Sequence, residues 1–308
     1  MKSAQYAIQG LVLVAVSACG EPCFENEEAS GLYGYDPCMW ACLNDPPPGP
    51  NDFYITSGDG SSELAGLTEV DGYVLFCDNP DLKDLSALAN ITRIDGNLVI
   101  DGNPNLVSPA GLENLQWVGD SLLVTGNLKL TEFRSANSLE YVGRDLVVIG
   151  QRDVLETLEL PDTLAEIGAR GPPGEPIRLL VARVSGSIDL PSGPLRANWL
   201  ELVNNEAATI MGLEGLYEID QILIHSNSHF EVLPTFSSLT HVEDLDIRDN
   251  HNLTSVVGLN VLESAERVVI VNNASLPTCR VEELIEGIGE ENIDSIAVEG
   301  NDDNATCE

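Results

Sequence analysis

The four histidines of the chain lie close together in the sequence, between residues 225 and 251. His229 follows Asn227 by two positions, and His251 follows Asn250 by one. If these asparagines mark equivalent places in successive repeats, the two imidazoles come near each other, an arrangement that suits zinc, copper or nickel. Polar turn residues that face water explain the same pattern with fewer assumptions. We therefore expect no metal and no other cofactor, and keep His229 and His251 as the weak candidates.

The sequence contains none of the familiar catalytic motifs. It lacks a nucleophile elbow, a phosphate-binding loop, a His-Glu-x-x-His pair and a cysteine beside a suitable base. Clustered carboxylates of the kind that cleave polysaccharides cannot be recognised among 50 acidic residues. We expect a protein that is not an enzyme, with a secreted carbohydrate-active enzyme as an alternative.

Cysteines carry the remaining chemistry. Setting aside Cys19, which ends an apolar N-terminal stretch, six remain, and an even number in an exported chain predicts disulfides. Cys279 and Cys307 lie alone near the C-terminus, so we expect them to pair. The other four allow three pairings, or a structural zinc site that an oxidising compartment disfavours. These four are Cys23, Cys38, Cys42 and Cys77.

The chain of 308 residues is strongly acidic, with 14 basic residues against 50 acidic ones and a formal net charge of −36. Such a charge argues against nucleic acid or an anionic membrane surface as a partner. Solubility is the simplest explanation of the acidity. Binding of Ca²⁺ or of a cationic partner is the alternative, although scattered carboxylates do not make a site.

The N-terminus has the features of a targeting segment. Lys2 precedes an apolar run, Ala7 to Val16, that is too short for a committed transmembrane helix. The run ends in Val16-Ser17-Ala18-Cys19, which resembles the bacterial lipobox. This resemblance implies a signal peptide over residues 1–18 and lipid attachment at Cys19. The protein would then be anchored in the bacterial cell envelope, at the outer membrane, on either its surface or its periplasmic side. An ordinary secretory signal with a chance cysteine is the alternative.

Most of the chain consists of repeats, and residues 91–139 show the pattern twice. An aliphatic residue is followed four residues later by a second, six later by a third and nine later by an asparagine, as at Ile94, Leu98, Ile100 and Asn103. A single short strand of this kind cannot close a core, whereas stacked copies bury their apolar faces against one another. The pattern predicts a mainly β fold, a parallel β-solenoid of about nine to ten coils.

An asparagine follows most of the predicted strands, 24 residues apart in the early coils and 23 apart in the last three. Its amide can bond both the turn and the same residue one coil away, so we expect a structural asparagine ladder. The expected ladder residues are Asn79, Asn103, Asn127, Asn205, Asn227, Asn250 and Asn273. Glycines precede the early strands, and there we expect backbone with φ > 0. These glycines are Gly72, Gly96, Gly119 and Gly143.

Other segments flank or interrupt the predicted solenoid, which spans residues 51–276. Residues 19–50 contain cysteines and end in a proline run, so we expect a semi-rigid spacer between lipid and solenoid. Residues 169–176 are rich in glycine and proline and are interpreted as an inserted loop. The insertion is either harmless or shapes a binding site, since loops on a rigid scaffold commonly carry function.

Residues 277–308 are expected to cap the solenoid. A short helix would place four apolar residues on one face, namely Val281, Leu284, Ile285 and Ile288. A last strand-like segment, Ile296 to Asn301, repeats the coil ending. The Cys279–Cys307 disulfide would staple this cap over the open end of the core, which needs protection from other strands.

The pattern Ile-x-Gly-x-Leu-x-Ile-x-Gly-Asn-Pro-x-Leu at Ile94 to Leu106 resembles the receptor L domain of insulin-receptor and EGF-receptor type proteins. The resemblance covers roughly residues 53 to 279 and implies a right-handed β-solenoid of the kind that helps to bind protein ligands. The late coils fit leucine-rich-repeat spacing instead, as in residues 242–250. Lipobox, acidic repeats and capped end together look like bacterial surface lipoproteins with such repeats.

These features predict a non-enzymatic, membrane-anchored lipoprotein that presents a rigid acidic solenoid to a protein or glycan partner. Its contact face would be the exposed side of the sheet, together with the 169–176 loop. A structural envelope or matrix protein without a discrete ligand is the second hypothesis, and specific saturable binding separates the two. The residues identify neither the ligand nor the oligomeric state.

Overall fold

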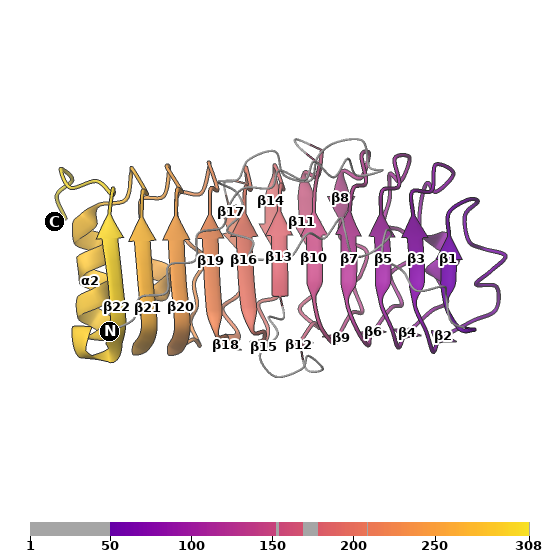
Figure 1. The fold of residues 1–308 in the computed structure, drawn as a ribbon, viewed down its shortest axis with the longest axis horizontal. Coiled ribbons are helices and arrows are strands. Elements are labelled where there is room, and N and C mark those ends of the chain that lie inside the picture. Colours follow the sequence, from indigo (N-terminus) through magenta and orange to yellow (C-terminus); the bar gives the residue numbers. More distant parts are fainter. Residues whose placement is uncertain (1–49, 152–153, 169–177, 208, 308) are drawn as a thin grey trace, which may run out of the picture.

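The computed structural model describes residues 50–151, 154–168, 178–207 and 209–307. The chain forms a β-solenoid of about ten turns, with three parallel sheets that run along its length (Figure 1). Strands from successive turns pair side by side, which confirms the predicted parallel β-solenoid. The sequence pattern predicted one strand in each coil, whereas many coils contain two or three.

The largest sheet, hereafter the large sheet, has 11 parallel strands. Its strands in order are β1 (Phe53–Ile55), β3 (Val74–Cys77), β5 (Leu98–Asp101), β7 (Leu122–Thr125), β10 (Leu146–Ile149), β13 (Arg178–Ala182), β16 (Trp199–Val203), β19 (Gln221–His225), β20 (His241–Arg248), β21 (Ser264–Val271) and β22 (Ile293–Glu299). Equivalent residues of neighbouring coils lie opposite each other, so Val74 pairs with Leu98, and Leu98 with Leu122. This register lets identical aliphatic positions stack along the rod.

Two smaller sheets form the other sides of the coils. The 7-stranded sheet contains β2 (Glu69–Val70), β4 (Arg93–Ile94), β6 (Trp117–Val118), β9 (Tyr141–Val142), β12 (Glu166–Ile167), β15 (Leu195–Arg196) and β18 (Leu216–Glu218). The 4-stranded sheet contains β8 (Glu132–Phe133), β11 (Thr157–Glu159), β14 (Ser187–Asp189) and β17 (Thr209–Met211). Each of these strands has only two or three residues, too few for period-two patterning to reveal it.

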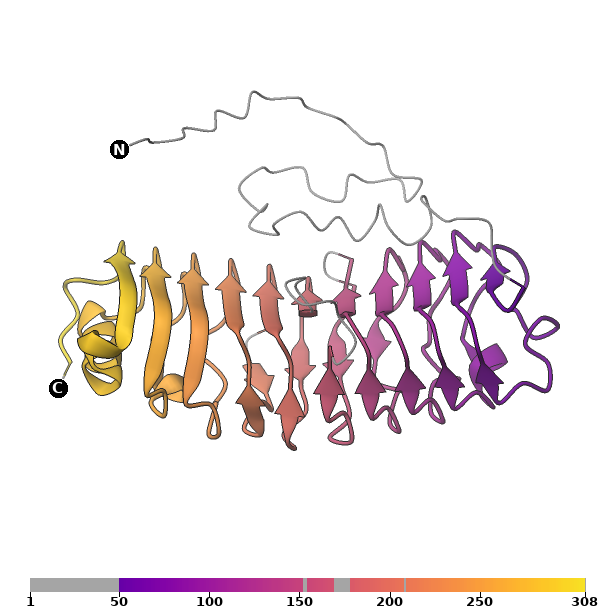
Figure 2. The ribbon, with the colours of Figure 1, turned by 60° about the horizontal axis from the view of Figure 1, so that its bottom comes forward.

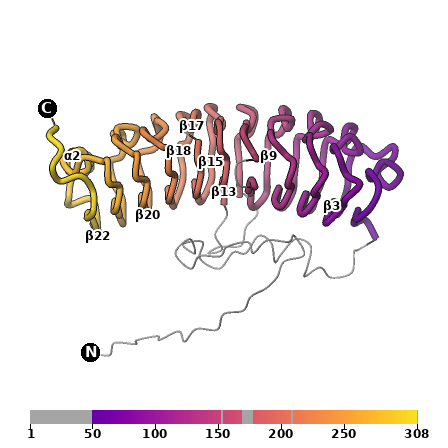
Figure 3. Tube along the Cα trace, turned by 90° about the horizontal axis from the view of Figure 1, so that it is seen from above, coloured from indigo at the N-terminus to yellow at the C-terminus, as the bar shows by residue number. Residues whose placement is uncertain are grey.

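One hydrophobic cluster fills the solenoid along its length. Seen from above, the coils stack as similar flattened loops (Figure 3). Alternate side chains of each large-sheet strand point into these loops, and Leu98 and Ile100 of β5 are fully buried. Because each coil supplies only one layer, the core is closed by stacking and not by any single coil.

The asparagine ladder is present at the corner where the large-sheet strands end. Asn227 donates from its backbone N–H and from Nδ2 to Oδ1 of Asn250, each at 3.0 Å. Its Nδ2 also donates to the carbonyl of Leu202 in the previous coil, at 2.8 Å. Equivalent bonds connect Asn79 to Asn127 and Asn205 to Asn273. The seven predicted asparagines are buried, so these bonds satisfy polar groups that stacking removes from water.

The ladder differs from the prediction in two places. It continues to Asn301, whose Oδ1 accepts the backbone N–H of Asn273 at 3.1 Å. In the coil of β13, Val184 occupies the ladder position, and its backbone N–H still donates to Asn205 Oδ1 at 3.0 Å. An apolar residue is therefore accepted in the middle of the ladder as long as the next coil supplies the acceptor.

The glycines before the early strands were expected to need φ > 0, and this expectation is wrong. Gly72, Gly96, Gly119 and Gly143 are not among the residues with positive φ. A Cβ atom on Gly143 would instead collide with the backbone carbonyl of Gly119 in the previous coil, and Gly119 has the same relation to Asp95. These glycines are required because neighbouring coils approach closely at this corner.

Positive φ occurs one residue before most ladder positions. Asp78, Asn204 and Asp249 have φ of 47°, 54° and 56°, and Gly102 and Gly126 have 69° and 66°. The left-handed residue turns the chain out of the large-sheet strand and presents the following amide to the next coil. Short polar side chains tolerate this conformation better than others, which explains their frequency here.

The middle of the solenoid contains an insertion. Leu146 of β10 pairs with Leu179 of β13, a step of 33 residues where the earlier steps are 24. Strand pairing continues across it without a change of sheet order. The predicted 169–176 loop lies within this step and outside the described residues.

The C-terminal end is capped by α2 (Thr278–Ile288), followed by η4 (Glu290–Asn292) and β22. The predicted helical face is confirmed, because Val281, Leu284, Ile285 and Ile288 are the buried residues of α2. Short 3-10 turns, η2 (Ser86–Leu88) and η3 (Val257–Leu259), occur in two coils. No helix in the described part of the chain is long and apolar enough to cross a membrane.

Candidate binding face

The large sheet presents one continuous outer face along the rod (Figures 1 and 2). Neighbouring side chains of a strand point to opposite sides, so the residues between core positions point outward. On β3, Val74 and Phe76 belong to the core, whereas Leu75 and Cys77 belong to a second hydrophobic cluster. Strand register then arranges the outward residues in rows. This is the side of the sheet that the sequence proposed as a contact face.

The central outward row is apolar over the N-terminal half of the sheet. Its members, hereafter the apolar row, are Leu75, Val99, Leu123, Val147 and Leu180. None of them is more than 5% exposed, and two are fully buried. An outward-facing row that is closed to water is not available to an external ligand.

Over the C-terminal half of the sheet several outward positions become charged, although Leu223 and Val269 stay apolar and buried. Five residues of β19, β20 and β21, hereafter the charged patch, are His225, Asp244, Asp246, Arg248 and Arg267. Arg267 Nη1 bonds both carboxylate oxygens of Asp244, at 2.8 and 2.7 Å. Arg248 bonds both oxygens of Asp246, and His225 Nε2 lies 3.2 Å from the same carboxylate. Arg267 Nη2 also reaches Asp246 Oδ2, at 3.5 Å, so the patch is one connected network across three strands.

Asp246 is the centre of this network and is held in its ionised form. Burial raises the pKa of its carboxyl, but hydrogen bonds from His225 and Arg248, together with their charges, outweigh burial and lower the pKa overall. The side chains of Arg248 and Arg267 remain 36% and 40% exposed. The network thus fixes two guanidinium groups in position while leaving part of each open to an acceptor from outside.

A buried charge cluster separates the apolar row from the charged patch. Arg178 Nε lies 3.4 Å from Glu201 Oε1, and the Arg178 backbone N–H donates to Asp145 Oδ1 at 3.0 Å. The Arg178 guanidinium also lies over the ring of Trp199, 5.0 Å from its centroid. Burial raises the pKa of both carboxyls, against the attraction of Arg178. Paired acids with raised pKa suit glycoside cleavage, but acids no more than 4% exposed cannot reach a polysaccharide.

The 7-stranded sheet contains the clearest aromatic pair. Trp117 and Tyr141 stack at 3.6 Å between ring centroids, with 10° between their planes. Arg93 lies over Trp117, 4.6 Å from the ring centroid. Sugars bind aromatic residues by stacking on an open ring face, and here Tyr141 and Arg93 already engage the Trp117 ring. The Trp117 ring is therefore already engaged by two side chains of the chain itself.

The candidate metal ligands His229 and His251 lie in exposed turns of adjacent coils. His229 Nδ1 is 3.0 Å from the hydroxyl of its neighbour Ser228. In residues 50–307, apart from the undescribed gaps, no three His, Cys, Asp or Glu side chains converge as a metal site requires. His225 instead joins the charged patch, through its contact with Asp246.

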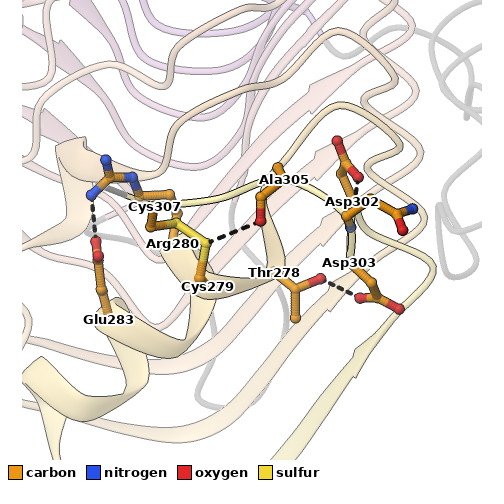
Figure 4. The surroundings of a disulfide bond; sticks show 9 residues. Thr278, Cys279, Arg280, Glu283, Asp302, Asp303, Ala305 and Cys307 are labelled. Carbon is orange, nitrogen blue, oxygen red and sulfur yellow. Dashed lines mark hydrogen bonds and ion pairs between the residues drawn. A yellow bond between two sulfur atoms is a disulfide. The ribbon is translucent and has the colours of Figure 1, made fainter.

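The cysteines near the C-terminus are paired as predicted. Cys279 at the start of α2 is bonded to Cys307, with 6.1 Å between their Cα atoms (Figure 4). Nearby, Thr278 donates to Asp303, and Arg280 forms an ion pair with Glu283 (Figure 4). The disulfide and the Thr278–Asp303 bond join the helix to the final segment, whereas the Arg280–Glu283 pair lies within α2.

Cys77 is also disulfide-bonded and fully buried on the outer face of β3. Because Cys279 and Cys307 bond each other, its partner is a cysteine outside the described residues. The predicted lipid attachment residue Cys19 and the cysteines Cys23, Cys38 and Cys42 all lie there.

A groove of about 730 Å³ lies between α2 and the last coils. Its wall includes Val256, Val257 and Leu284, and Arg280 lies at its side. The groove is large enough for a small ligand. We rank it second to the charged patch because its lining has one guanidinium group, Arg280, held by Glu283 at 2.7 Å, whereas the patch fixes two.

The charged patch was missed at the sequence level, although its signal is visible in β20. Asp244, Asp246 and Arg248 alternate there with the core residues Leu245 and Ile247. In β10 the positions between core residues are apolar instead. A comparison of outward positions between coils would therefore have found the patch.

No protein-family model matches the chain, and no curated protein matches its sequence. The function is therefore argued from the geometry of the outer face.

Proposed function

We propose that the protein is a non-enzymatic lipoprotein, anchored through Cys19, that recognises a protein partner through the charged patch. The observation that carries this proposal is the fixed pair of exposed guanidinium groups. In a chain with 14 basic and 50 acidic residues, Arg248 and Arg267 lie with His225 on three adjacent strands. Arginine is enriched among the residues that dominate binding energy at protein interfaces.

Rigidity supports recognition as the role of this surface. Asp244 and Asp246 hold the arginine side chains by paired hydrogen bonds, so little rotamer freedom remains to be lost on binding. The strands beneath are hydrogen-bonded on both sides within the large sheet. A partner would therefore meet a surface that is already arranged.

The chemistry of the partner follows from electrostatic interactions at short range and at long range. At short range, the guanidinium groups bind carboxylates or backbone carbonyls. At long range, a net charge of −36 attracts basic proteins and repels acidic ones. We therefore propose a partner of net positive charge with an acceptor-rich contact site, whose association slows as salt is added.

The test is site-specific photo-cross-linking of the full chain in its native envelope. The cross-linker replaces Val271, which pairs with Arg248 across the sheet, or Tyr217 on the 7-stranded sheet as the control. A protein captured from position 271 and not from 217 supports the proposal. Capture that is equal from both positions contradicts it, and capture from neither favours the structural envelope role.

The captured protein is then measured against variants. The double substitution Arg248→Ala and Arg267→Ala should weaken its binding by about 30-fold or more. Arg196→Ala is the matched control, because Arg196 is similarly exposed and ion-paired with Glu218 on another sheet. If the double variant binds as tightly as Arg196→Ala, the patch is not the contact site.

A further inference from the structure

The last strand of the large sheet, β22, keeps one edge free. It pairs with β21 from Ile293 to Glu299 in one register, and no strand of the described chain lies on its other side (Figure 1). In earlier coils the N–H at the position of Ile296 donates to the next coil, as Leu98 does to the Ser121 carbonyl at 2.9 Å. The Ile296 N–H therefore faces the free edge, where a further strand would accept it.

The hydrophobic core also reaches this edge. Ile296 continues the inward row of the large sheet that runs from Val74 to Val268, in which every member is at most 1% exposed. Ile296 itself is 41% exposed. On either side of it in β22, Ile293 is buried and Val298 packs partly buried against the core. An apolar residue of the core row is thus open to water where another coil would cover it.

The opposite end of the solenoid is closed by its own chain. Ile55 of the first strand, β1, is 2% exposed, and Leu64 in the loop that follows is 3% exposed. A Cβ atom on Gly60 of this loop would lie 2.9 Å from Ile55 Cδ1, so the loop lies directly over the end of the core. An open core row is therefore a feature of the β22 end, and does not follow from ending a solenoid.

Charge is the protection that the free edge has. β22 has seven residues, contains no proline and shows no bulge against β21, so none of these blocks a further strand. Four exposed acidic residues lie in or just before it, namely Glu290, Glu291, Asp294 and Glu299. Residues 281–308 contain no lysine or arginine. This charge repels a second copy of the acidic chain and attracts a basic strand.

We propose that β22 is a docking edge for an extended, basic segment of another protein, which adds to the large sheet as one more strand. Main-chain hydrogen bonds to the free edge provide affinity, an apolar side chain of the segment covers Ile296, and its lysine or arginine side chains meet the flanking carboxylates. The edge is separate from the charged patch, and the arginine of β21, Arg267, is already paired with Asp244.

Titration of the full chain with synthetic peptides tests the edge. The probe is a peptide of alternating lysine and valine with the seven-residue length of β22. Its control has the same side chains and charge but N-methylated backbone amides, which cannot donate hydrogen bonds. The probe should bind at least about tenfold more tightly than the control and should slow hydrogen exchange of the Ile296 amide by a similar factor. Equal affinities would show that charge alone attracts the peptide, and would overturn the proposal.

Two charge-matched variants locate the site. Asp294→Lys with Glu299→Lys reverses the charge of the edge and should weaken binding of the probe by about tenfold or more. Glu282→Lys with Glu286→Lys makes the same change in net charge at exposed positions of α2, and should bind the probe nearly as tightly as the unchanged protein. Equal binding by the two variants, or no binding of the probe by the unchanged protein, would overturn the proposal.

The edge and the charged patch can fail separately. Arg248→Ala with Arg267→Ala should still bind the probe, because these side chains lie on the outer face and not at the free edge. Sedimentation of the unchanged protein and of Ile296→Lys tests the other occupant. Self-association that Ile296→Lys abolishes would show that a second copy covers β22, and would overturn the proposal of a basic partner.

Discussion

Asn103 directs both its backbone N–H and its Nδ2 to a single acceptor, Oδ1 of Asn127, at 3.2 and 3.1 Å. The same Nδ2 reaches back to the carbonyl of Phe76 at 3.0 Å, and Asn103 Oδ1 accepts the backbone N–H of Asn79. One side chain thus connects three successive coils. It replaces the water that these buried backbone groups have lost.

Replacement of Asn103 with alanine should lower the free energy of unfolding by about 3 kcal/mol, because it leaves the Asn79 N–H and the Phe76 carbonyl buried without this partner. Chemical unfolding followed by circular dichroism measures the loss. Asn105→Ala is the control, since its amide bonds Pro80 at the surface and should matter by less than about 0.5 kcal/mol. Equal losses in the two variants would show that the ladder adds nothing.

Two glycine substitutions should have opposite effects. Gly143→Ala places a Cβ against the backbone carbonyl of Gly119, which cannot move without shifting a coil, so we expect a loss of about 2 kcal/mol or more. Gly287→Ala lies in α2 with no atom near the new Cβ, and should gain roughly 0.5–1 kcal/mol from helix propensity. Thermal unfolding of both variants gives the comparison. A stable Gly143→Ala protein would mean that the coils are packed less closely here than described.

Glu201 and Asp246 should affect the pH dependence of the free energy of unfolding in opposite directions. Burial raises the pKa of Glu201 above its ordinary 4.5, so above that pH the folded state holds a proton that the unfolded state has lost, and stability falls as pH rises through this window. Hydrogen bonds and cations lower the pKa of Asp246 below 3.8, so its contribution is complete above 3.8 and is lost as pH falls through the lowered value.

Urea unfolding between pH 3 and 8 separates the two groups. Glu201→Gln should flatten the decline above pH 4.5, and Asp246→Asn should flatten the loss below pH 3.8. The isosteric amides keep the shape of each side chain. If the free energy of unfolding depends on pH in the same way for Glu201→Gln and the unchanged protein, the decline above pH 4.5 does not come from Glu201.

The proposed anchor is tested by fractionation. Cys19→Ser removes the acceptor thiol, so the protein should move from the membrane fraction to the soluble fraction. Ser17→Ala, next to the same site, is the control and should leave the protein with the membrane. If Cys19→Ser remains membrane-bound, acylation of Cys19 is not the anchor.

The sequence predicts the parts of the fold that repeat. Residue spacing predicts the stacked aliphatic positions, such as Leu98 and Leu122, the asparagine ladder and the apolar face of α2. The pattern repeats because equivalent positions in successive coils have equivalent neighbours. The Cys279–Cys307 bond follows from their isolation near the C-terminus.

Features that depend on contacts between coils were not predictable in this way. Gly143 was predicted to have a positive φ. Glycine either permits that conformation or leaves room for a close neighbour, and only the position of Gly119 shows that the second reason applies. Arg248 and Arg267 are separated by 19 residues in the sequence, and their common network exists only through the register of β20 and β21. Short strands such as β4, Arg93–Ile94, contain too few residues to show a period.

The strands of the large sheet lie across the long axis of the rod, so the hydrogen bonds between coils run along that axis (Figure 1). A pull applied to the two ends would load these bonds one coil at a time. Each early coil that peels away would release 24 residues, about 80 Å of chain, while the remaining stack stays folded. The molecule would therefore lengthen under tension in regular steps, one coil at a time.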